Sequence, residues 1–210
     1  VSVRTYGGIK DVSRQFLDRG YQIDSIHYQD MAASYAANLD VDVINGAGTS
    51  GSHTGILNWA NINSVTTGTA TATSVNAKIA QAIAKVNETR FLPADVIVMH
   101  PRRWGWFTAQ SDSNGRAWMV PGSSQVVNSF GSGDPAAYGL VGELHGLPVY
   151  TDANIPTTIS TSTITGATED TIIVARRADL LLWENGGGAA PRQFRFEDVG
   201  SATNTIRLSV

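Results

Sequence analysis

Apolar side chains recur at steps of three and four through residues 21–45, a stretch with neither glycine nor proline. This spacing predicts a single helix of about 35 Å with one apolar face. The face consists of Tyr28, Met31, Tyr35, Leu39 and Val43. Gly20 and Gly46 bracket the stretch, where a helix is expected to begin and end. We expect the middle three residues of the face to pack against strands from the C-terminal quarter, while Asp42 falls away from it.

Residues 39–43 also alternate with a period of two, which is typical of a strand. The alternative matters because residues 46–51 read GAGTSG and match G-x-G-x-x-G, the dinucleotide-binding pattern that follows a strand. That motif needs a helix opening at its last glycine and an acidic residue about 20 positions on. The chain has no acidic residue between Asp42 and Glu88. We therefore favour a helix capped by Gly46 and followed by a glycine-rich turn.

Elsewhere, short apolar runs alternate with segments rich in glycine, threonine or proline. Residues 74–87 predict a second helix capped by Ser74, after a Thr-rich loop. Residues 94–99 have the form of a buried central strand, and Pro101 suits the first position of a helix continuing over 102–109. Further strands are predicted over residues 1–6, 147–150, 171–175, 179–183, 193–197 and 205–210. Because no βαβ rhythm repeats, we predict an α+β fold.

Three smaller expectations concern the connections. One or two helical turns are predicted over residues 12–19, leading into the long helix. Residues 56–59 read ILNW and predict a buried anchor after the glycine-rich turn. Pro148 favours a sheet edge or the start of a strand, because proline cannot donate to the ladder.

Composition places the chain among ordinary globular proteins, with 42% apolar and 16% charged residues. The net charge of −3 gives no reason to expect sequence-independent nucleic-acid binding, which needs clustered Lys and Arg. Without cysteine, disulfides, zinc–thiolate sites and thiol chemistry are excluded. No apolar run approaches the roughly 18 residues of a membrane span. Because the sequence begins at Val1 and not at methionine, we expect an internal piece of a longer chain.

The histidines do not have the spacing of a metal site. They are His27, His53, His100 and His145. Glu143 and His145 are two positions apart, but a third ligand is missing, so an exposed pair beside a turn is the favoured interpretation. His100 precedes Pro101 and is expected to cap the following helix.

Two pairs of adjacent arginines are the remaining candidates for chemistry. Arg102 with Arg103, and Arg176 with Arg177, have the charge to grip a phosphate, yet such pairs more often form surface ion pairs. Residues 48–52 read GTSGS and fail the G-x-S-x-G pattern at its last position. No nucleophile, base and orienting group come together. We therefore predict no enzyme activity and no catalytic, cofactor-binding or metal-binding residue.

Several segments, in order, resemble the major capsid protein family of tailed bacteriophages. The long helix, NGAGT at 45–49 and TGIL at 54–57 resemble that family's spine helix and the turn after it. VSRQ at 12–15 resembles the entry that follows its extended loop.

The resemblance continues through the rest of the chain. ADVIVMHP at 94–101, RRW at 102–104 and DSNGR at 112–116 resemble a strand, helix and turn of the family. GLPV at 146–149 and ANIP at 153–156 resemble its next strand and loop. The shared order and spacing cover most of the chain.

This resemblance implies a capsid-type fold with a long spine helix, a peripheral domain of long strands and an apical α/β domain. The implied boundaries are 1–20 for the end of the extended loop, 21–45 for the spine helix, 46–183 for a mainly apical domain and 184–210 for return strands. In a whole family member, a preceding loop strand would pair with residues 1–6. We therefore expect residues 1–7 to be poorly covered within their own chain, and residues 205–210 to lie in the peripheral sheet near the spine helix.

The implied function is that of a structural subunit, which self-assembles into hexamers and pentamers of an icosahedral phage head enclosing the genome. The implied partners are further copies, a scaffold or maturation protease, a portal, and packaged DNA without sequence-specific contacts. The implied location is the virion after assembly in the bacterial host cytoplasm, without a membrane and without an organic cofactor. No residue is assigned to a covalent cross-link. An encapsulin-like cargo shell is the close alternative, and a nucleotide-binding oxidoreductase acting through Gly46 to Gly51 is the distant one.

Overall fold

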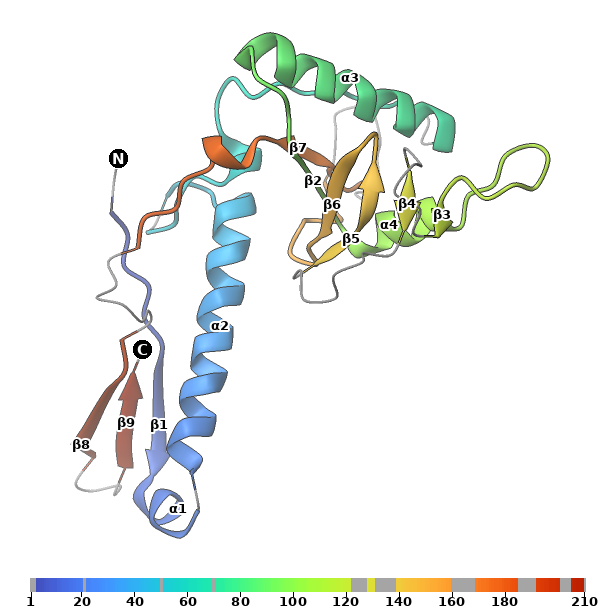
Figure 1. Cartoon of the computed structure of the whole chain (residues 1–210). Coiled ribbons are helices and arrows are strands. Elements are labelled where there is room, and N and C mark those ends of the chain that lie inside the picture. Colours follow the sequence, from blue (N-terminus) through green and yellow to red (C-terminus); the bar gives the residue numbers. More distant parts are fainter. Residues whose placement is uncertain are drawn as a thin grey trace. The chain divides into compact units, whose positions relative to one another are not determined.

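The computed structural model describes residues 3–20, 22–49, 51–68, 71–121, 128–130, 139–159, 169–184, 192–200 and 205–209 (Figure 1). They fall into two compact units. Unit 1 combines residues 1–59 with 182–210, and unit 2 consists of residues 60–181. Unit 1 is built on a long helix and a small antiparallel sheet, whereas unit 2 is a mixed sheet with two helices.

The long helix of unit 1 is α2, Ile23–Asn45, which runs unbroken for 23 residues. Gln22 precedes it with a left-handed φ of 58°, and Tyr21 lies outside the described residues. At the other end the Gly46 amide donates to the Asp42 carbonyl at 2.8 Å. The single helix is confirmed, and the strand alternative for residues 39–43 is wrong. The alanine-rich middle of the segment sustains helix formation through those residues.

A three-stranded antiparallel sheet packs against α2 (Figure 1). Its order is β1-β9-β8, with β1 Ile9–Ser13, β9 Thr205–Ser209 and β8 Phe194–Gly200. The short helix α1, Arg14–Arg19, follows β1 directly. The buried cluster between sheet and helix consists of Val12, Met31, Ile206 and Leu208. The expected placement of residues 205–209 beside the helix is confirmed, and Val210 lies outside the described residues.

The sheet covers only part of the apolar face of α2. Met31 packs against it as predicted, but Leu39 is only half-buried and lies outside the buried cluster. Tyr35 instead donates a hydrogen bond to Glu184 at 3.1 Å. A strand of five residues spans about 17 Å, roughly half of the helix, so it cannot reach the whole face. Asp42, predicted to lie away from the packed face, is buried, which corrects that expectation.

The first strand begins later than the alternation predicted. Residues 3–8 pair with no described strand, and β1 starts at Ile9, where it pairs with Ser209. Val1 and Ser2 lie outside the described residues. The strand prediction for residues 3–6 is therefore wrong, because β9 ends opposite Ile9. As expected, this segment is poorly covered, with Val3 90% exposed.

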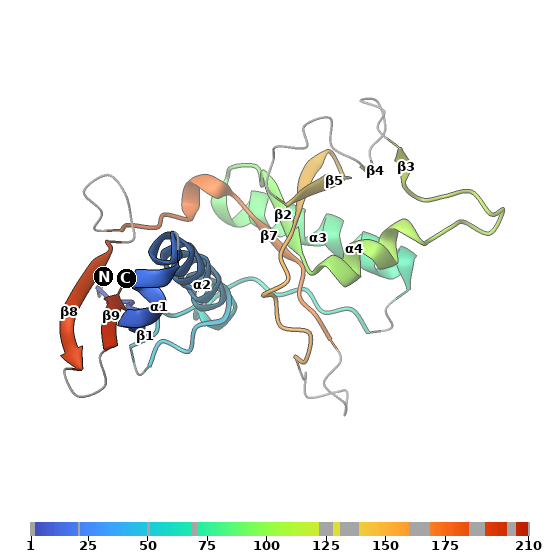
Figure 2. The same cartoon turned by 90° about the horizontal axis from the view of Figure 1, so that it is seen from below.

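Unit 2 is organised around β2, Val96–Met99 (Figure 2). The sheet order is β3-β4-β5-β6-β2-β7, with β2 parallel to β6 and antiparallel to β7. The other strands are β3 Val120–Pro121, β4 Ser129–Phe130, β5 Leu140–Leu144, β6 Leu147–Thr151 and β7 Ile173–Ala175. Two helices, α3 Ala72–Arg90 and α4 Pro101–Thr108, pack on it. The predicted buried strand and the helix starting at Pro101 are both confirmed.

One hydrophobic core joins the sheet of unit 2 to both helices. Its buried members are Val75, Ile79, Ile97, Met99, Phe107, Met119, Leu144 and Val149. Val75 and Ile79 come from α3, and Phe107 comes from α4. Ile97, Met99 and Val149 have no exposed surface at all. Unit 2 therefore has a hydrophobic core of its own.

Two local predictions in unit 2 need correction. Helix α3 begins before Ser74, because the Thr71 side chain caps it by accepting from the Ser74 amide at 3.2 Å. Strand β6 is not at a sheet edge, since it lies between β5 and β2. Pro148 is tolerated there as a strand-start residue, because pairing with β2 begins only at Val149.

The apolar stretch 179–183 is not a strand. A short 3₁₀ helix, η2 Arg177–Asp179, ends there, and the chain continues without sheet pairing. Both carboxylate oxygens of Asp179 accept from Arg90, at 2.7 and 3.0 Å. This ion pair directs the chain along the end of α3 and not into the sheet.

Candidate functional site

The glycine-rich turn after α2 is closed by backbone hydrogen bonds. The Gly55 amide donates to the Gly46 carbonyl at 2.8 Å, and the Gly48 amide donates to the His53 carbonyl at 3.0 Å. The turn follows a helix and not a strand, and only the 3₁₀ turn Ile56–Asn58 comes after it. The helix that a dinucleotide motif requires at Gly51 is absent from the described residues. The nucleotide-binding interpretation of Gly46 to Gly51 is therefore wrong.

Close backbone packing explains why glycine is required at positions 46 and 55. A Cβ on Gly46 would lie 2.2 Å from the His53 carbonyl oxygen, and a Cβ on Gly55 would lie 2.4 Å from the Gly46 amide nitrogen. Backbone on both sides leaves no room for a side chain. The buried anchor predicted at residues 56–59 is wrong, since none of the four is buried and Trp59 is 52% exposed.

Replacing Gly55 with alanine is expected to lower the free energy of unfolding of unit 1 by about 1–3 kcal/mol, the usual effect of overpacking. The physical reason is the 2.4 Å approach of the new Cβ to backbone that cannot rotate away. Gly8→Ala is the control in the same unit, because nothing lies within 4 Å of its Cβ position. Urea unfolding of both variants checks this. Equal stability of the two would contradict the packing argument.

The histidines occupy separate places, and among the described residues no three metal-ligating side chains gather. His100 caps α4 as predicted, its Nδ1 accepting from the Arg102 amide at 3.1 Å. His27 lies on α2 beside the Phe16 ring. His145 forms the β5–β6 turn with a φ of 52°, and its amide donates to Asn128 at 3.1 Å. Glu143 is exposed on β5.

The arginine pairs form ion pairs, as predicted. Arg102 and Arg103 both bind Asp170, with Nε atoms 2.9 and 2.8 Å from its carboxylate oxygens. The Asp170 side chain is 1% exposed. Sequence reasoning missed Asp170, because it lies far along the chain from both arginines. Arg176 and Arg177 similarly pair with Asp179 and Asp95, each at 3.7 Å, and these carboxylates take the place of a phosphate.

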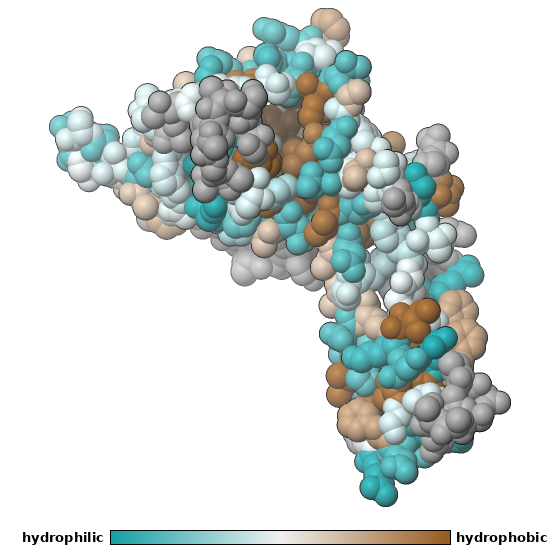
Figure 3. Space-filling model, turned by 180° about the vertical axis from the view of Figure 1, so that it is seen from behind, coloured by the Kyte–Doolittle hydropathy of each residue, from teal (hydrophilic) through white to brown (hydrophobic). Residues whose placement is uncertain are grey.

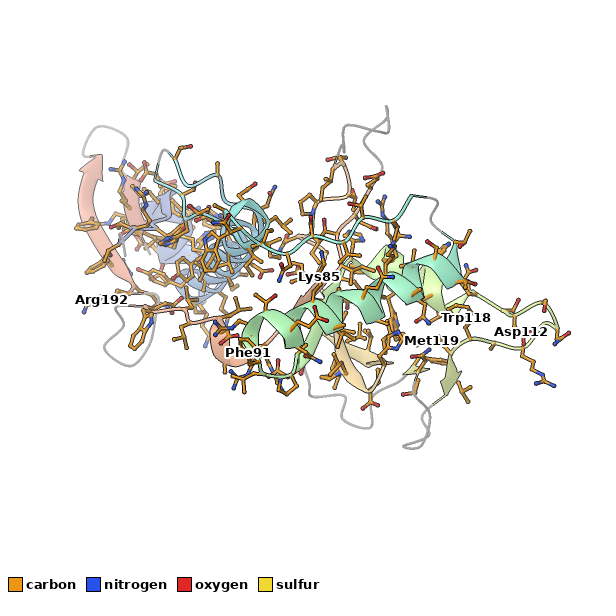
Figure 4. The ribbon with its side chains drawn as sticks, turned by 90° about the horizontal axis from the view of Figure 1, so that it is seen from above. Lys85, Phe91, Asp112, Trp118, Met119 and Arg192 are labelled. Carbon is orange, nitrogen blue, oxygen red and sulfur yellow. The ribbon has the colours of Figure 1, made fainter. Side chains whose placement is uncertain are left out.

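Unit 2 carries an exposed apolar patch at the end of α3, which we call the Phe91 patch. It consists of Phe91, Leu92, Leu180 and Leu181. The Arg90–Asp179 ion pair brings the ends of α3 and η2 together beneath it. Phe91 is 90% exposed and has a left-handed φ of 56°, the position where helices usually end in glycine (Figure 4). A strained, solvated aromatic side chain contributes nothing to the stability of unit 2.

Unit 1 exposes a second apolar surface on β8, the outer strand of its sheet. Phe194 and Phe196 are each about half exposed, and their rings stack with centroids 6.4 Å apart. Figure 3 shows further apolar side chains at the surface of both units. An outer strand also presents unpaired backbone groups, so the Phe194–Phe196 pair marks a surface suited to contact with another chain.

Comparison with known proteins identifies the family. Residues 1–187 match the phage capsid family. The chain belongs to the phage capsid family. A comparison with curated proteins gives no match.

Solved capsids have a similar fold to this capsid-family chain. The capsid of a native GTA particle, computed with C5 symmetry, superposes with a TM-score of 0.61 and 21% identity over 97% of this chain. The capsid of an empty GTA particle, computed with the same symmetry, gives 0.61 and 17%. The chain spans 65% of the length of those chains. The predicted family resemblance and the α+β capsid fold are confirmed.

The ion pairs of Asp170 with Arg102 and Arg103 are expected to make the stability of unit 2 depend on pH. Burial raises the pKa of Asp170, but hydrogen bonds and charge from Arg103 and Arg102 outweigh it, so the pKa lies below its ordinary value of 3.8. A lowered carboxyl pKa stabilises the fold above 3.8, and this stabilisation is lost as the pH falls through the lower folded value.

Asp170→Asn is expected to cost about 1–3 kcal/mol at pH 7, because hydrogen bonds to charged groups are lost. Its melting temperature should also depend less on pH below 4 than that of the unchanged protein. Asp30→Asn is the control, since the Lys10–Asp30 pair is exposed at 3.4 Å and such pairs contribute about 0–1 kcal/mol. Parallel acid dependence in both variants would refute the role of Asp170.

Proposed function

We propose that this chain is a self-assembling structural subunit of an icosahedral phage head and has no enzymatic role. The family match over residues 1–187 carries this proposal. The fold shared with solved capsid chains supports it. Hexamers and pentamers of such subunits would enclose the genome, and the protein would reside in the virion.

The two units correspond, in this proposal, to the domains of a capsid subunit. Unit 1, with α2 and the β1-β9-β8 sheet, would be the peripheral domain with its spine helix. Unit 2 would be the apical domain at the centre of each capsomer. The observation in favour is that each unit has its own buried cluster, so each can act as a separate body in a shell.

The exposed apolar surfaces are the proposed subunit contacts. Burying one phenylalanine side chain contributes about 1.5–3 kcal/mol. The Phe91 patch exposes one phenylalanine and three leucines, and the Phe194–Phe196 pair exposes two stacked phenylalanines. Repeated around a capsomer, contacts of this size stabilise a closed assembly while leaving the isolated subunit folded.

Further partners belong to the same proposal. A scaffold or maturation protease and a portal would act during assembly in the bacterial host cytoplasm. With a net charge of −3, contacts to packaged DNA would be few and independent of sequence. Among the described residues, no helix is long and apolar enough to cross a membrane.

Negative-stain electron microscopy and light scattering of the purified protein test this function. We expect capsomer rings or closed shells, and their loss on Phe91→Asp. Ile62→Asp is the control, an exposed apolar position of unit 2 outside the patch. Dispersed monomers at every concentration would contradict the proposal. Particles from cells that contain one protein cargo and no nucleic acid would favour the encapsulin-like alternative.

A further inference from the structure

Residues 3–8 of unit 1 form a segment that is held to α2 through Tyr6. The Tyr6 hydroxyl donates a short hydrogen bond to Oδ2 of Asp42. Its ring meets the Tyr35 ring edge-on with centroids 6.3 Å apart, and lies 5.9 Å from the His53 ring. Among the described residues, the side-chain hydrogen bonds of this segment come from Tyr6 alone.

Asp42 is the point where three separate segments meet. Its side chain is on α2 and only 8% of the residue is exposed. The same Oδ2 atom accepts from the His53 amide at 2.7 Å, which ties in the glycine-rich turn. Burial and the bond to Asp42 raise the pKa of Tyr6 to about 12, so Tyr6 keeps its donor proton at neutral pH. A buried carboxylate requires such partners, and here one of them belongs to an otherwise exposed segment.

Apart from Tyr6 and the half-buried Arg4, the residues of the segment are exposed. Val3 is highly exposed, and Gly7 and Gly8 are exposed residues directly before β1. A Cβ on Gly8 would meet nothing within 4 Å. Beside the Tyr6 contacts, an open groove of about 250 Å³ lies between the segment and α2. Its lining includes Tyr6, Gly7 and Gly8 on one side and Met31, Ser34 and Tyr35 on the other.

We propose that the Tyr6–Asp42–His53 contact is a releasable latch. Closed, it holds residues 3–8 on α2 of their own chain. Open, it lets the segment pivot about Gly7 and Gly8, while β1 stays paired with β9 and α2 stays intact. The latch is a property of the isolated chain. That the released segment reaches a neighbouring subunit rests on the proposed shell function.

The chain has no cysteine, so two introduced labels report on the latch alone. Nitroxides at Val3→Cys and Ala37→Cys, both exposed positions of unit 1, give the distance between the segment and α2 by pulsed electron paramagnetic resonance. With the latch closed we expect one narrow distance. Tyr6→Phe keeps the ring and removes the donor, so the narrow peak should be lost to a broad distribution.

Tyr28→Phe is the matched control, because the Tyr28 hydroxyl donates to the Phe194 carbonyl at 3.0 Å in the same unit and not to Asp42. It should keep the narrow peak. Asp42→Asn provides a second way to weaken the latch and should broaden the peak as well. Circular dichroism confirms that each variant keeps its helix. A narrow peak retained in Tyr6→Phe, or equal broadening in Tyr28→Phe, would overturn the latch.

Loss of the latch is distinguishable from loss of assembly. The distance measurement uses dispersed chains and is independent of shells. A broad peak in Tyr6→Phe, with no particles from any variant, would support the latch and contradict the shell function. Particles from the unchanged chain, together with an unaltered distance peak in Tyr6→Phe, would support the shell function and contradict the latch.

Discussion

Replacing Phe107 with alanine is expected to lower the free energy of unfolding of unit 2 by about 3–5 kcal/mol. Phe107 on α4 is 1% exposed and belongs to the core with Ile97, Met99 and Val149. The Trp106 ring meets it edge-on with centroids 5.1 Å apart. Because the surrounding core is close-packed, the structure is expected to relax only partly around the cavity left by the ring. Urea unfolding followed by tryptophan fluorescence measures the loss.

The same substitution elsewhere in unit 2 provides the control. Phe91→Ala removes an identical side chain from a solvated position, so its effect should stay within about 0.5 kcal/mol. Both variants lose the same side chain, so the difference between their free energies of unfolding measures the effect of burial. If Phe107→Ala cost no more than Phe91→Ala, the assignment of the unit 2 core would be wrong.

Leu208→Ala is expected to cost unit 1 about 2–5 kcal/mol. Leu208 lies on β9, the central strand of the sheet, with no exposed surface. It packs with Val12 of β1 and Met31 of α2, so its removal opens a cavity between sheet and helix. Thermal and urea unfolding followed by helix content measure the effect, because α2 carries most of the helix in this unit.

Leu39→Ala tests whether the effect of removing a leucine in unit 1 depends on its burial and not only on its place on the apolar face of α2. Leu39 shares the predicted apolar face of α2 but lies beyond the sheet and is only half-buried. Its truncation should therefore cost about 1 kcal/mol, near the centre of the range for point substitutions and below the cost of a buried leucine. A cost equal to that of Leu208→Ala would show that Leu39 is covered by something other than the β1-β9-β8 sheet.

Motifs in order along the chain were sufficient to predict the family, because each combines local structure with a fixed separation. The turn NGAGT follows the helix end, and HP precedes a helix in which His100 is the cap and Pro101 the first residue. The candidate contact surfaces were not predictable in this way. Phe91 and Leu181 are 90 residues apart, and the ion pair between Arg90 and Asp179 links the two parts of the chain that carry them.

Local chemistry by itself determined the helices and the buried strand of this protein. An alanine-rich stretch without glycine or proline makes α2, and the apolar run before Pro101 makes β2. Helix capping, helix propensity and hydrophobic periodicity act over a few residues, so they can be predicted from the sequence. Even the opposing alternation in residues 39–43 could not outweigh a helix already propagating into it.

Only the tertiary structure decided which faces and edges are used. Alternation predicted a strand at residues 3–6, but pairing exists from Ile9 because β9 stands there. Helical periodicity placed Asp42 on the polar face, yet Tyr6 and His53 converge on it and bury it. These contacts come from residues far apart in the chain. Bringing such residues together costs loop-closure entropy, which is offset only when the whole fold forms.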